Sequence, residues 1–411
     1  MSARKLQYAM LFILTSIFVS CEGIFNNDDS KLTANAGPDQ TTIVGSYVIL
    51  DASKSNGSIE WYEWEQDEKN PQKVKIFSGY DYSRQQIGFV EKGSYKFRLI
   101  VKSGTKVSAA DEALVTVNPN PQSLFEDPNL EIAVRFMLKL PTEILTDDIL
   151  LTLDSLRYFD IVADISSLQG LQRCKNLTCL QMDHQSISDI SPVATLAKLR
   201  VLDFAENQKI SDITPLTNLI QLEWINLSDN LITDISPLAN MIRLKYLNLR
   251  YNGSINDISS LSNMVQLEEL KMANALLTNL SPLQKLSNLR TLWFTSCNIS
   301  DISYLKNLNN LINLKITFGN INNLMPLSNL TKLEWLALEK NNTSDISALK
   351  NLPNLEYVRL WDNQVTNIKP LVDNAGVGKG DIVALNNNPL DEISVNEYIP
   401  ALQARGVAVT W

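Results

Sequence analysis

A short leucine-containing phrase recurs through most of this chain, and its spacing restricts the folds that the chain can adopt. One copy reads Leu222-Glu-Trp-Ile225-Asn-Leu227-Ser-Asp-Asn230, and successive copies start 22 or 23 residues apart. The nine copies begin at Leu177, Leu199, Leu222, Leu244, Leu267, Leu289, Leu311, Leu333 and Leu355. A single unit of this length cannot bury its own apolar face, so neighbouring units must stack. The spacing therefore predicts a linear array with one continuous core.

The positions within one copy predict the form of each unit. A period of about 20 to 29 residues with the pattern L-x-x-L-x-L-x-x-N is typical of leucine-rich repeats, whose units each give one short parallel strand and a return segment. We number positions as offsets from the first leucine of a copy. Residues at offsets 0, 3 and 5 are expected to point inward along the strand, which leaves the residues between them on one outer surface.

Asparagine recurs at offset 8, at Asn207, Asn230, Asn252, Asn341 and Asn363. Its amide both donates and accepts hydrogen bonds, so it suits a turn in which backbone groups would otherwise be buried without partners. The series is interrupted at Gln185, Ala275, Cys297 and Gly319.

Aspartate recurs in the return segment, where we expect it to accept hydrogen bonds from local backbone amides rather than to bind metal. These aspartates are Asp189, Asp212, Asp234, Asp257, Asp301 and Asp345. A Ser-Pro or Thr-Pro pair begins at Ser191, Thr214, Ser236 and Ser281. The hydroxyl residue is expected to cap a short helical turn, because proline suits the first turn of a helix.

Two copies of the return, Ile210-Ser-Asp-Ile-Thr-Pro-Leu216 and Ile232-Thr-Asp-Ile-Ser-Pro-Leu238, resemble internalin-like bacterial leucine-rich repeats. The resemblance implies an α/β solenoid over residues 153–379, with parallel strands on a concave face and short helical or 3-10 returns. It also implies caps at both ends. Residues 124–152 are expected to form a helical N-terminal cap, and residues 380–411 a last strand and a helical C-terminal cap.

Residues 33–118 contain short runs of alternating apolar residues separated by turns, which is typical of an antiparallel sandwich. Ala36-Gly-Pro-Asp-Gln40 and the strand around Trp64 resemble a PKD domain, an immunoglobulin-like extracellular module. The acidic loop of that family is shortened to Ser55-Asn-Gly-Ser58, so we expect a spacer rather than a calcium or ligand site. Residues 119–123 are expected to form a stiff linker. The predicted fold class is multidomain, a β-sandwich followed by a solenoid.

Residues 1–20 predict a signal peptide, because basic residues precede an apolar run, Ala9–Val19, that is shorter than the roughly 20 residues of a membrane-spanning helix. Ser20 before Cys21 resembles a bacterial lipobox, which implies cleavage after residue 20 and acylation of Cys21. The polar, acidic segment 21–32 is expected to be a flexible tether. We expect a lipid-anchored protein of the bacterial cell envelope, at the outer membrane and exposed on its surface. An ordinary secretory signal is the alternative.

The charge balance and the cysteines narrow the classes of partner. The net charge of −9 becomes −11 when Arg4 and Lys5 leave with the signal peptide, and nucleic acid needs a concentrated basic surface. Nucleic acid is therefore not an expected partner. Cys174, Cys179 and Cys297 occupy repeat positions that small apolar residues also fill. We expect buried free thiols there, with a Cys174–Cys179 bridge as the alternative.

Aromatic and basic side chains gather on the expected concave face, at offsets 2, 4, 6 and 7. The candidate ligand-binding residues are Trp224, Tyr246, Arg250, Tyr251, Trp293, Lys315, Phe318, Trp335, Tyr357, Arg359 and Trp361. A leucine core does not need outward tryptophans, and dense surface aromatics mark contact sites. The alternative is that these rings only cover neighbouring strands. The basic residues of this face, which include Lys271, indicate a partner that carries negative charge.

The size of this face indicates the kind of partner. Ten strands at a spacing of about 4.8 Å, each exposing about 16 Å, give about 750 Å². That area is close to the roughly 800 Å² per partner of a standard protein interface. We therefore expect a monomer that binds a protein ligand, for adhesion or surface recognition. The alternatives are a glycan-binding lipoprotein of a polysaccharide uptake system and a scaffold without a specific ligand.

Catalysis is not expected. His184 is the single histidine of the chain, and Asp183, Asp203 and Glu206 near it follow no recognised catalytic spacing. The sequence carries no phosphate loop, nucleotide fingerprint or metal-binding motif. We therefore expect neither a cofactor nor a metal.

Overall fold

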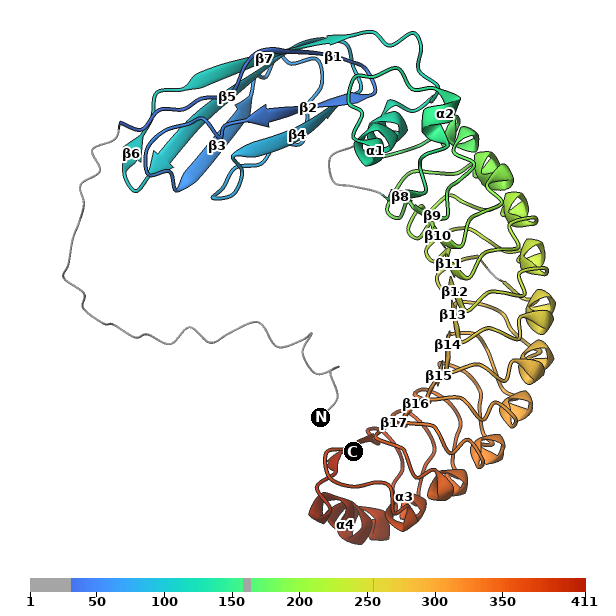
Figure 1. Cartoon of the computed structure of the whole chain (residues 1–411). Helices are drawn as coiled ribbons and strands as arrows, with labels where there is room; N and C mark the ends of the chain where they lie inside the picture. Colours follow the sequence, from blue (N-terminus) through green and yellow to red (C-terminus); the bar gives the residue numbers. More distant parts are fainter. Residues whose placement is uncertain (1–30, 158–163, 254) are drawn as a thin grey trace.

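A computed structural model describes residues 31–157, 164–253 and 255–411 (Figure 1). The predicted signal peptide, Cys21 and nearly all of the predicted tether lie outside the described residues. The described chain forms an arc in which a β-sandwich continues into a curved solenoid. Within these ranges, no helix has the length and apolar character needed to cross a membrane.

The N-terminal domain packs two sheets against each other, which confirms the predicted sandwich. The larger sheet has the order β1-β7-β5-β3 with β6 beside β5, and the smaller sheet pairs β2 with β4. The strands are β1 Gln40–Ile43, β2 Ser46–Asp51, β3 Trp61–Gln66, β4 Arg84–Phe89, β5 Gly93–Ser103, β6 Lys106–Val107 and β7 Asp111–Asn118. Alternate residues of β5, Tyr95, Phe97 and Leu99, are buried in the core with Phe89 and Trp64. The pairing is antiparallel except between β1 and β7, which run parallel.

The solenoid is a single parallel sheet that lines the inner side of the arc (Figure 1). Its strands are β8 Ser155–Arg157, β9 Cys179–Gln181, β10 Val201–Asp203, β11 Trp224–Asn226, β12 Tyr246–Leu249, β13 Glu269–Ala273, β14 Thr291–Thr295, β15 Asn313–Thr317, β16 Trp335–Ala337, β17 Tyr357–Arg359, β18 Ile382–Ala384 and β19 Ala408–Thr410. Neighbouring strands pair one repeat apart, as in the register of Val201 with Trp224. Strand β8 lies within the predicted repeat range 153–379, where Leu153 and Leu156 follow offsets 0 and 3 of the pattern, whereas β19 lies beyond the predicted last strand, β18.

The return segments form short 3-10 turns on the outer side of the arc (Figure 1). They are η1 Leu171–Arg173, η2 Ser191–Thr195, η3 Thr214–Leu216, η4 Ser236–Leu238, η5 Ser259–Asn263, η6 Ser281–Lys285, η7 Ser303–Leu305, η8 Met325–Leu327 and η9 Ser347–Asn351, followed by the α-helix α3 Lys369–Asp373. The predicted Ser and Thr caps are wrong. Ser191 is already inside its turn, the preceding Ile190 is the cap, and no side chain caps the helix.

The aspartates supply the hydrogen bonds that the hydroxyl residues do not. Asp234 Oδ1 accepts from the backbone N–H of Ser236 at 2.8 Å, and its Oδ2 accepts from the hydroxyl of the same serine at 2.9 Å. The same aspartate-to-amide bond forms at Asp189, Asp212, Asp257, Asp301 and Asp345. The predicted structural role of these carboxylates is confirmed.

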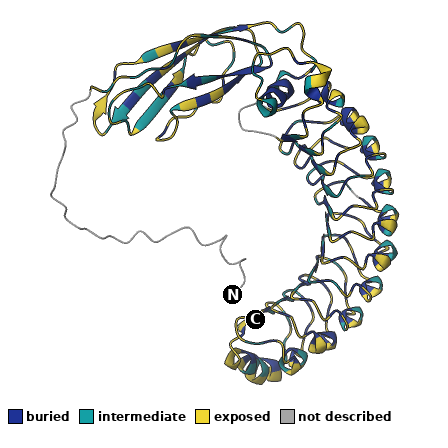
Figure 2. Ribbon diagram, viewed as in Figure 1, coloured by how far each residue is buried: buried dark blue, intermediate teal, exposed yellow. Residues whose placement is uncertain are grey.

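The core is one continuous apolar column that runs from the N-terminal cap to the last coil. The inward residues Leu222, Ile225 and Leu227 have no exposed surface. In Figure 2 the buried residues follow the interior of the coils, and exposed residues gather on the outer turns. The predicted inward positions at offsets 0, 3 and 5 are thereby confirmed.

The asparagines at offset 8 connect successive coils inside this column. Asn230 Nδ2 donates to the carbonyls of Phe204 at 2.8 Å and Leu227 at 3.2 Å, and its Oδ1 accepts from the N–H of Ile210 at 3.3 Å. The pattern recurs at Asn207, Asn252, Asn341, Asn363 and Asn388. Each amide therefore satisfies buried backbone groups of two neighbouring coils.

Helical caps close both ends of the column. The N-terminal cap contains α1 Pro128–Leu138, whose N-cap residue Asp127 accepts from the N–H of Asn129 at 2.8 Å, and α2 Asp147–Leu150. The C-terminal cap contains a π-helical turn, Ser394–Tyr398, that continues into α4 Ile399–Ala404. Strand β19 then adds to the sheet beyond β18.

Helix α1 also joins the two domains, because it packs against β2 and β4 of the sandwich as well as against β8. Arg135 and Glu131 form an ion pair of 2.7 Å within α1, and both side chains are 2% exposed. The ring of Phe136 lies 5.8 Å from that of Tyr47 in β2. The sandwich therefore rests directly on the cap, in addition to the covalent linker that the sequence predicted.

Candidate binding face

The concave face presents the predicted aromatic and basic side chains on neighbouring strands. Trp224, Tyr246, Trp293, Lys315, Trp335, Tyr357 and Arg359 lie within β11, β12 and β14 to β17, whereas Arg250, Tyr251, Phe318 and Trp361 follow the ends of strands. None of these side chains belongs to the leucine core. Most are half-buried by one another, and the rings of Tyr251 and Phe318 are exposed.

The rings form two groups, the stacked pair Trp224–Tyr246 and a second stacked pair, Trp335–Tyr357, which Trp293 joins. Trp224 and Tyr246 stack with centroids 4.6 Å apart and planes 6° from parallel. Trp335 and Tyr357 stack at 5.8 Å and 5°. Trp293 lies 6.0 Å from Trp335 at a tilt of 39°. Since strands pair in register, rings at the same offset of adjacent coils meet face to face.

Cations fill the spaces between the rings. Lys271 Nζ lies 5.3 Å from the centroid of Tyr246 and 4.5 Å from that of Trp293, so it joins the two aromatic groups. It is also paired with Glu269. Lys315 makes no ion pair or hydrogen bond within the part of the chain that the structure describes. The face thus combines aromatic surface with a cation whose charge is free.

A second group of cations and rings lies at the strand ends. Lys340 Nζ lies 4.8 Å from the centroid of Phe318 and 5.6 Å from that of Trp361. Arg359 contacts the ring of Tyr357 at 5.8 Å and donates through Nε to Glu339 Oε1 at 2.9 Å. The sequence analysis did not include Lys340 among the site residues. Its position at offset 7, the offset of Phe318 and next to that of Trp361, could have identified it.

Two polar atoms of this face are buried without a hydrogen-bond partner in the described structure, Trp293 Nε1 and Glu339 Oε2. Glu339 is 2% exposed although it lies at an outward offset. Buried polar groups are nearly always satisfied, so an unpaired donor and an unpaired acceptor here need an explanation. The other carboxylate oxygen of Glu339, Oε1, accepts from Arg359 Nε at 2.9 Å.

The N-terminal end of the face is acidic, and none of the candidate aromatic residues lies in β9 or β10. His184 contacts Asp183 through Nδ1 and Glu206 through Nε2, each at 2.9 Å. The hydrogen bond that His184 donates to Asp183 raises the pKa of His184, and the charge of Glu206 adds to this effect. Burial raises the pKa of the neighbouring Asp203 carboxyl. Asp183 and Glu206 thus lie on opposite sides of the His184 ring.

The described cysteines are free, and Cys174 and Cys297 are buried whereas Cys179 is half-buried on the concave face. Burial raises the pKa of Cys174 to about 12, so this thiol is a packing residue. No Cys174–Cys179 bridge forms. In the described ranges, no group of three or more histidine, cysteine, aspartate or glutamate side chains is arranged to hold a metal ion.

Comparisons with known proteins agree with both domains. Residues 36–117 match the model of a PKD domain family, and residues 175–218 and 220–263 match that of leucine-rich repeats. No curated protein matches the chain. An internalin (inlF) from Listeria monocytogenes is 29% identical, with 70% of this chain and 92% of that chain covered and a TM-score of 0.59.

Two further solved structures are similar to the repeats. Internalin C2 (inlC2) from Listeria monocytogenes is 25% identical over 70% of this chain and 95% of that chain, with a TM-score of 0.38. A leucine-rich-repeat protein of Leptospira interrogans is 16% identical over 60% and 82%, with a TM-score of 0.45. The chain therefore combines a PKD-like domain with leucine-rich repeats in a solenoid similar to that of internalins.

Proposed function

We propose that this chain is a cell-surface binding protein that captures a folded protein on the concave face of its repeats. The observation that carries the proposal is the series of rings and cations from Trp224 to Tyr357, which lies outside the leucine core. Aromatic and arginine side chains supply most of the energy of protein interfaces. The similarity to an internalin supports the same class of function.

The packing of the rings favours a protein over a glycan. A sugar stacks on the open face of an aromatic ring, but Trp224 and Tyr246 cover one face of each other, as do Trp335 and Tyr357. Lys271 lies over the rings of Tyr246 and Trp293. The rings are thus held rigidly with much of their flat surface covered, which suits contact with protein side chains more than stacking on sugars.

The charge on the face favours an acidic surface on the partner. Lys315 is unpaired within the described chain and Arg359 is partly exposed, on a protein whose net charge is −9. A partner that places carboxylates opposite these cations would be attracted at long range and oriented on binding. Binding of an uncharged glycan would not depend on the charges of Lys315 and Arg359.

We place the protein at the bacterial surface, anchored through an acylated Cys21 with the sandwich as a spacer. Lipid chains contribute about 0.8 kcal/mol per buried CH₂, so multiple chains would hold the protein firmly. Replacing Cys21 by serine should move the protein from the membrane fraction to the soluble or secreted fraction. Membrane retention of the Cys21→Ser variant would contradict the anchor and leave the binding face unaffected.

The binding proposal is tested by replacing Trp224, Trp293 and Trp335 together by alanine. Extracellular proteins should be captured by the full-length wild-type chain and not by the triple variant, with a loss of at least about a hundredfold in affinity. Trp411→Ala is the matched control, because Trp411 is 51% exposed, follows β19 and is not one of the candidate binding residues. Thermal unfolding should be similar in all three proteins.

The same proteins distinguish the alternatives when they are tested on a glycan array. Capture of a protein that weakens with salt supports a charged protein interface, because salt screens exposed charges. Salt-insensitive binding to a glycan would assign the face to sugar recognition instead. Equal capture by the wild type and the triple variant would remove the concave face as the site.

A further inference from the structure

A second row of contacts crosses the side of the solenoid, where the chain passes from the helical turns back to the strands. Side chains at offset −1, directly before the first leucine, bond the neighbouring coil there. Asn288 donates to the carbonyl of Val265 at 2.9 Å, and Asn310 donates to that of Ser287 at 2.9 Å. Further bonds of this row come from Asn176, Lys198, Lys332 and Asn354. These bonds tie successive coils together along this side.

Three consecutive coils interrupt this row. Gln221, Arg243 and Gln266 occupy offset −1 in these coils, and their side chains make no hydrogen bond or ion pair within the residues that the structure describes. The carbonyls of Ile220 and Ile242, which an asparagine would cap, likewise receive no hydrogen bond from the described chain. Donors and acceptors are therefore free at three adjacent positions.

Exposed apolar side chains occur in the same three coils, at offset −2. Ile220 is 47% exposed, Ile242 57% and Val265 43%. The other coils carry Lys175, Ala197, Ser287, Asn309, Thr331 and Pro353 at this offset. Large exposed aliphatic residues thus coincide with the interruption of the hydrogen-bonded row, which stacking of the coils does not require.

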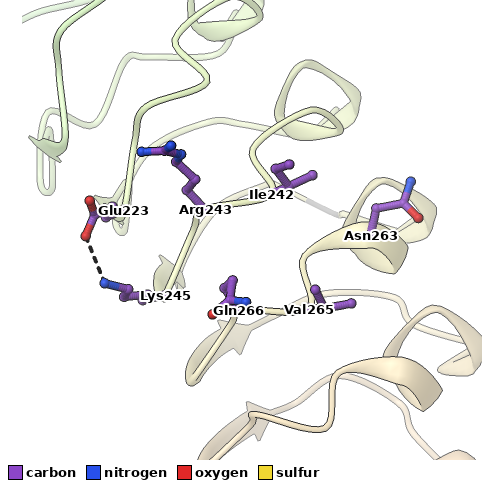
Figure 3. A pocket seen from close by; sticks show the side chains of 7 residues that line it. All are labelled: Glu223, Ile242, Arg243, Lys245, Asn263, Val265 and Gln266. Carbon is purple, nitrogen blue, oxygen red and sulfur yellow. Dashed lines mark hydrogen bonds and ion pairs between the residues drawn. The ribbon is translucent and has the colours of Figure 1, made fainter.

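A groove of about 500 Å³ runs between two of these coils (Figure 3). Ile242 and Val265 form its apolar part, and Arg243, Lys245 and Gln266 lie along it. Lys245 Nζ pairs with Glu223 Oε2 at 3.0 Å, as the dashed line shows.

The groove has a positive charge on an acidic protein. Glu223 is shared between Lys245 and Arg200, whose Nε donates to it at 2.9 Å. Hydrogen bonds from these two cations lower the pKa of Glu223, so the carboxylate is already neutralised within the protein. Arg243 has no such partner among the described residues. The local surplus of positive charge complements an acidic ligand.

We infer that this lateral groove is a second docking site, for an extended segment of a partner protein in which apolar side chains are flanked by aspartate or glutamate. The apolar side chains of the segment would pack on Ile220, Ile242 and Val265. Its carboxylates would pair with Arg243 and Lys245, and its backbone would bond Gln221, Gln266 and the free carbonyls. Extended peptides are commonly recognised through such a combination of backbone bonds and side-chain contacts.

This site is separate from the proposed concave site, because its apolar residues precede the strands instead of projecting from them. The two surfaces meet where Glu223 and Lys245 also border a smaller hollow that contains Trp224. The inference does not depend on what the concave face binds. Failure of the concave-face proposal therefore leaves it intact.

The test uses the immobilised full-length protein and three short synthetic peptides. One contains leucines flanked by aspartates, the second has lysines in place of the aspartates, and the third has serines in place of the leucines. The first should bind at least about tenfold more tightly than the other two, because it alone offers both contacts. Raising the salt concentration should weaken it, since Arg243 and Lys245 are solvent-accessible charges.

Variants locate the binding site. Ile242→Ser and Arg243→Gln should each weaken binding of the first peptide about tenfold. Ile382→Ser, which changes another exposed isoleucine, and Trp335→Ala on the concave face should leave binding unchanged. Thermal unfolding of Ile242→Ser should match that of the wild type, because the side chain is solvent-exposed.

Several results would overturn the inference. These are no binding of the first peptide at concentrations up to about 1 mM, equal binding of the lysine peptide, and equal loss of binding in Trp335→Ala. Self-association of the wild type that Ile242→Ser abolishes would assign the groove to a second copy of this chain. That result too would reject the acidic segment as its ligand.

Discussion

At the scale of single residues, one backbone position of every leucine-containing coil is left-handed. At offset 7, from His184 to Asp362, φ lies between 54° and 61°. Asparagine and aspartate tolerate this region, and Asn274 and Asp229 occupy it in two coils, whereas bulky side chains are disfavoured there. Tyr251 and Phe318 occupy it with about half of each side chain exposed. Little packing offsets their strain, which is a pattern expected of residues kept for binding.

Tyr251→Asn should therefore stabilise the fold, and the reverse change at the equivalent position, Asn274→Tyr, should destabilise it. The expected changes in the free energy of unfolding are about +0.5 and −1 kcal/mol. The stabilisation by Tyr251→Asn is expected to be smaller than the destabilisation by Asn274→Tyr. The reason is that Tyr251→Asn also removes the contact with Arg250, which lies 5.8 Å from the ring centroid. Urea denaturation of both variants measures these values. A loss of stability in Tyr251→Asn would show that the ring contributes to packing.

His184→Asn tests the charge at the acidic end of the face, at a position whose backbone suits asparagine. The hydrogen bond that His184 donates to Asp183 raises the pKa of His184 in the folded state. Protonated His184 therefore stabilises the fold; this contribution is complete below the ordinary pKa of about 6.5 and is lost as the pH rises through the raised pKa. The melting temperature of the wild type should exceed that of the variant at low pH and approach it at high pH. A difference that does not change with pH would contradict this.

At the scale of elements, the sequence predicts the repeated features, the sandwich and the caps, and it misses single contacts between particular side chains. The repeat period determines the positions of the inward leucines, the asparagines and the outward rings, so the sequence pattern is sufficient to locate them. Strand β19 carries no leucine motif, because it is held by a single neighbouring strand and by α4. Burial of Glu339 depends on Arg359 one coil away. The lateral groove is formed by residues at offsets −2 and −1. The repeat pattern does not determine how the side chains at these positions are oriented.

Asn230→Ala tests how far the asparagine row holds the coils together. The substitution removes bonds to the backbone of Phe204, Leu227 and Ile210 and leaves these groups buried. The expected cost is about 2 to 4 kcal/mol, because each unsatisfied buried group costs about 1 to 3 kcal/mol.

The matched control is Asn320→Ala. Asn320 is exposed and its side chain bonds only other exposed asparagines. Its replacement should change stability by less than about 0.5 kcal/mol. Urea denaturation measures both variants. Equal effects would mean that water replaces the amide of Asn230 inside the column.

At the scale of the whole molecule, the junction between the two domains determines the direction of the sandwich relative to the solenoid. Glu131 lies at its centre and accepts hydrogen bonds from Arg135, Asn120 and Ser123. The linker is thus tied to α1 by its own side chains. A carboxylate buried in this way is stable only while its partners stay in place. We therefore expect the sandwich to move with the solenoid as one body, which would fix its direction relative to the concave face.

Gly45→Val should open this junction. Gly45 has φ of +82°, and a Cβ there would lie 2.7 Å from Glu131 Oε2, so a side chain must push β2 away from α1. Gly104→Val is the matched control, because Gly104 also has a positive φ, +54°, but faces open space. Both variants incur the left-handed strain of about 1 to 2 kcal/mol. Small-angle scattering of the full-length protein should show a larger maximum dimension for Gly45→Val alone, and proteolysis at residues 119–123 should become faster. Unchanged scattering in Gly45→Val would mean that the junction yields locally and that the contact with α1 does not set the angle between the domains.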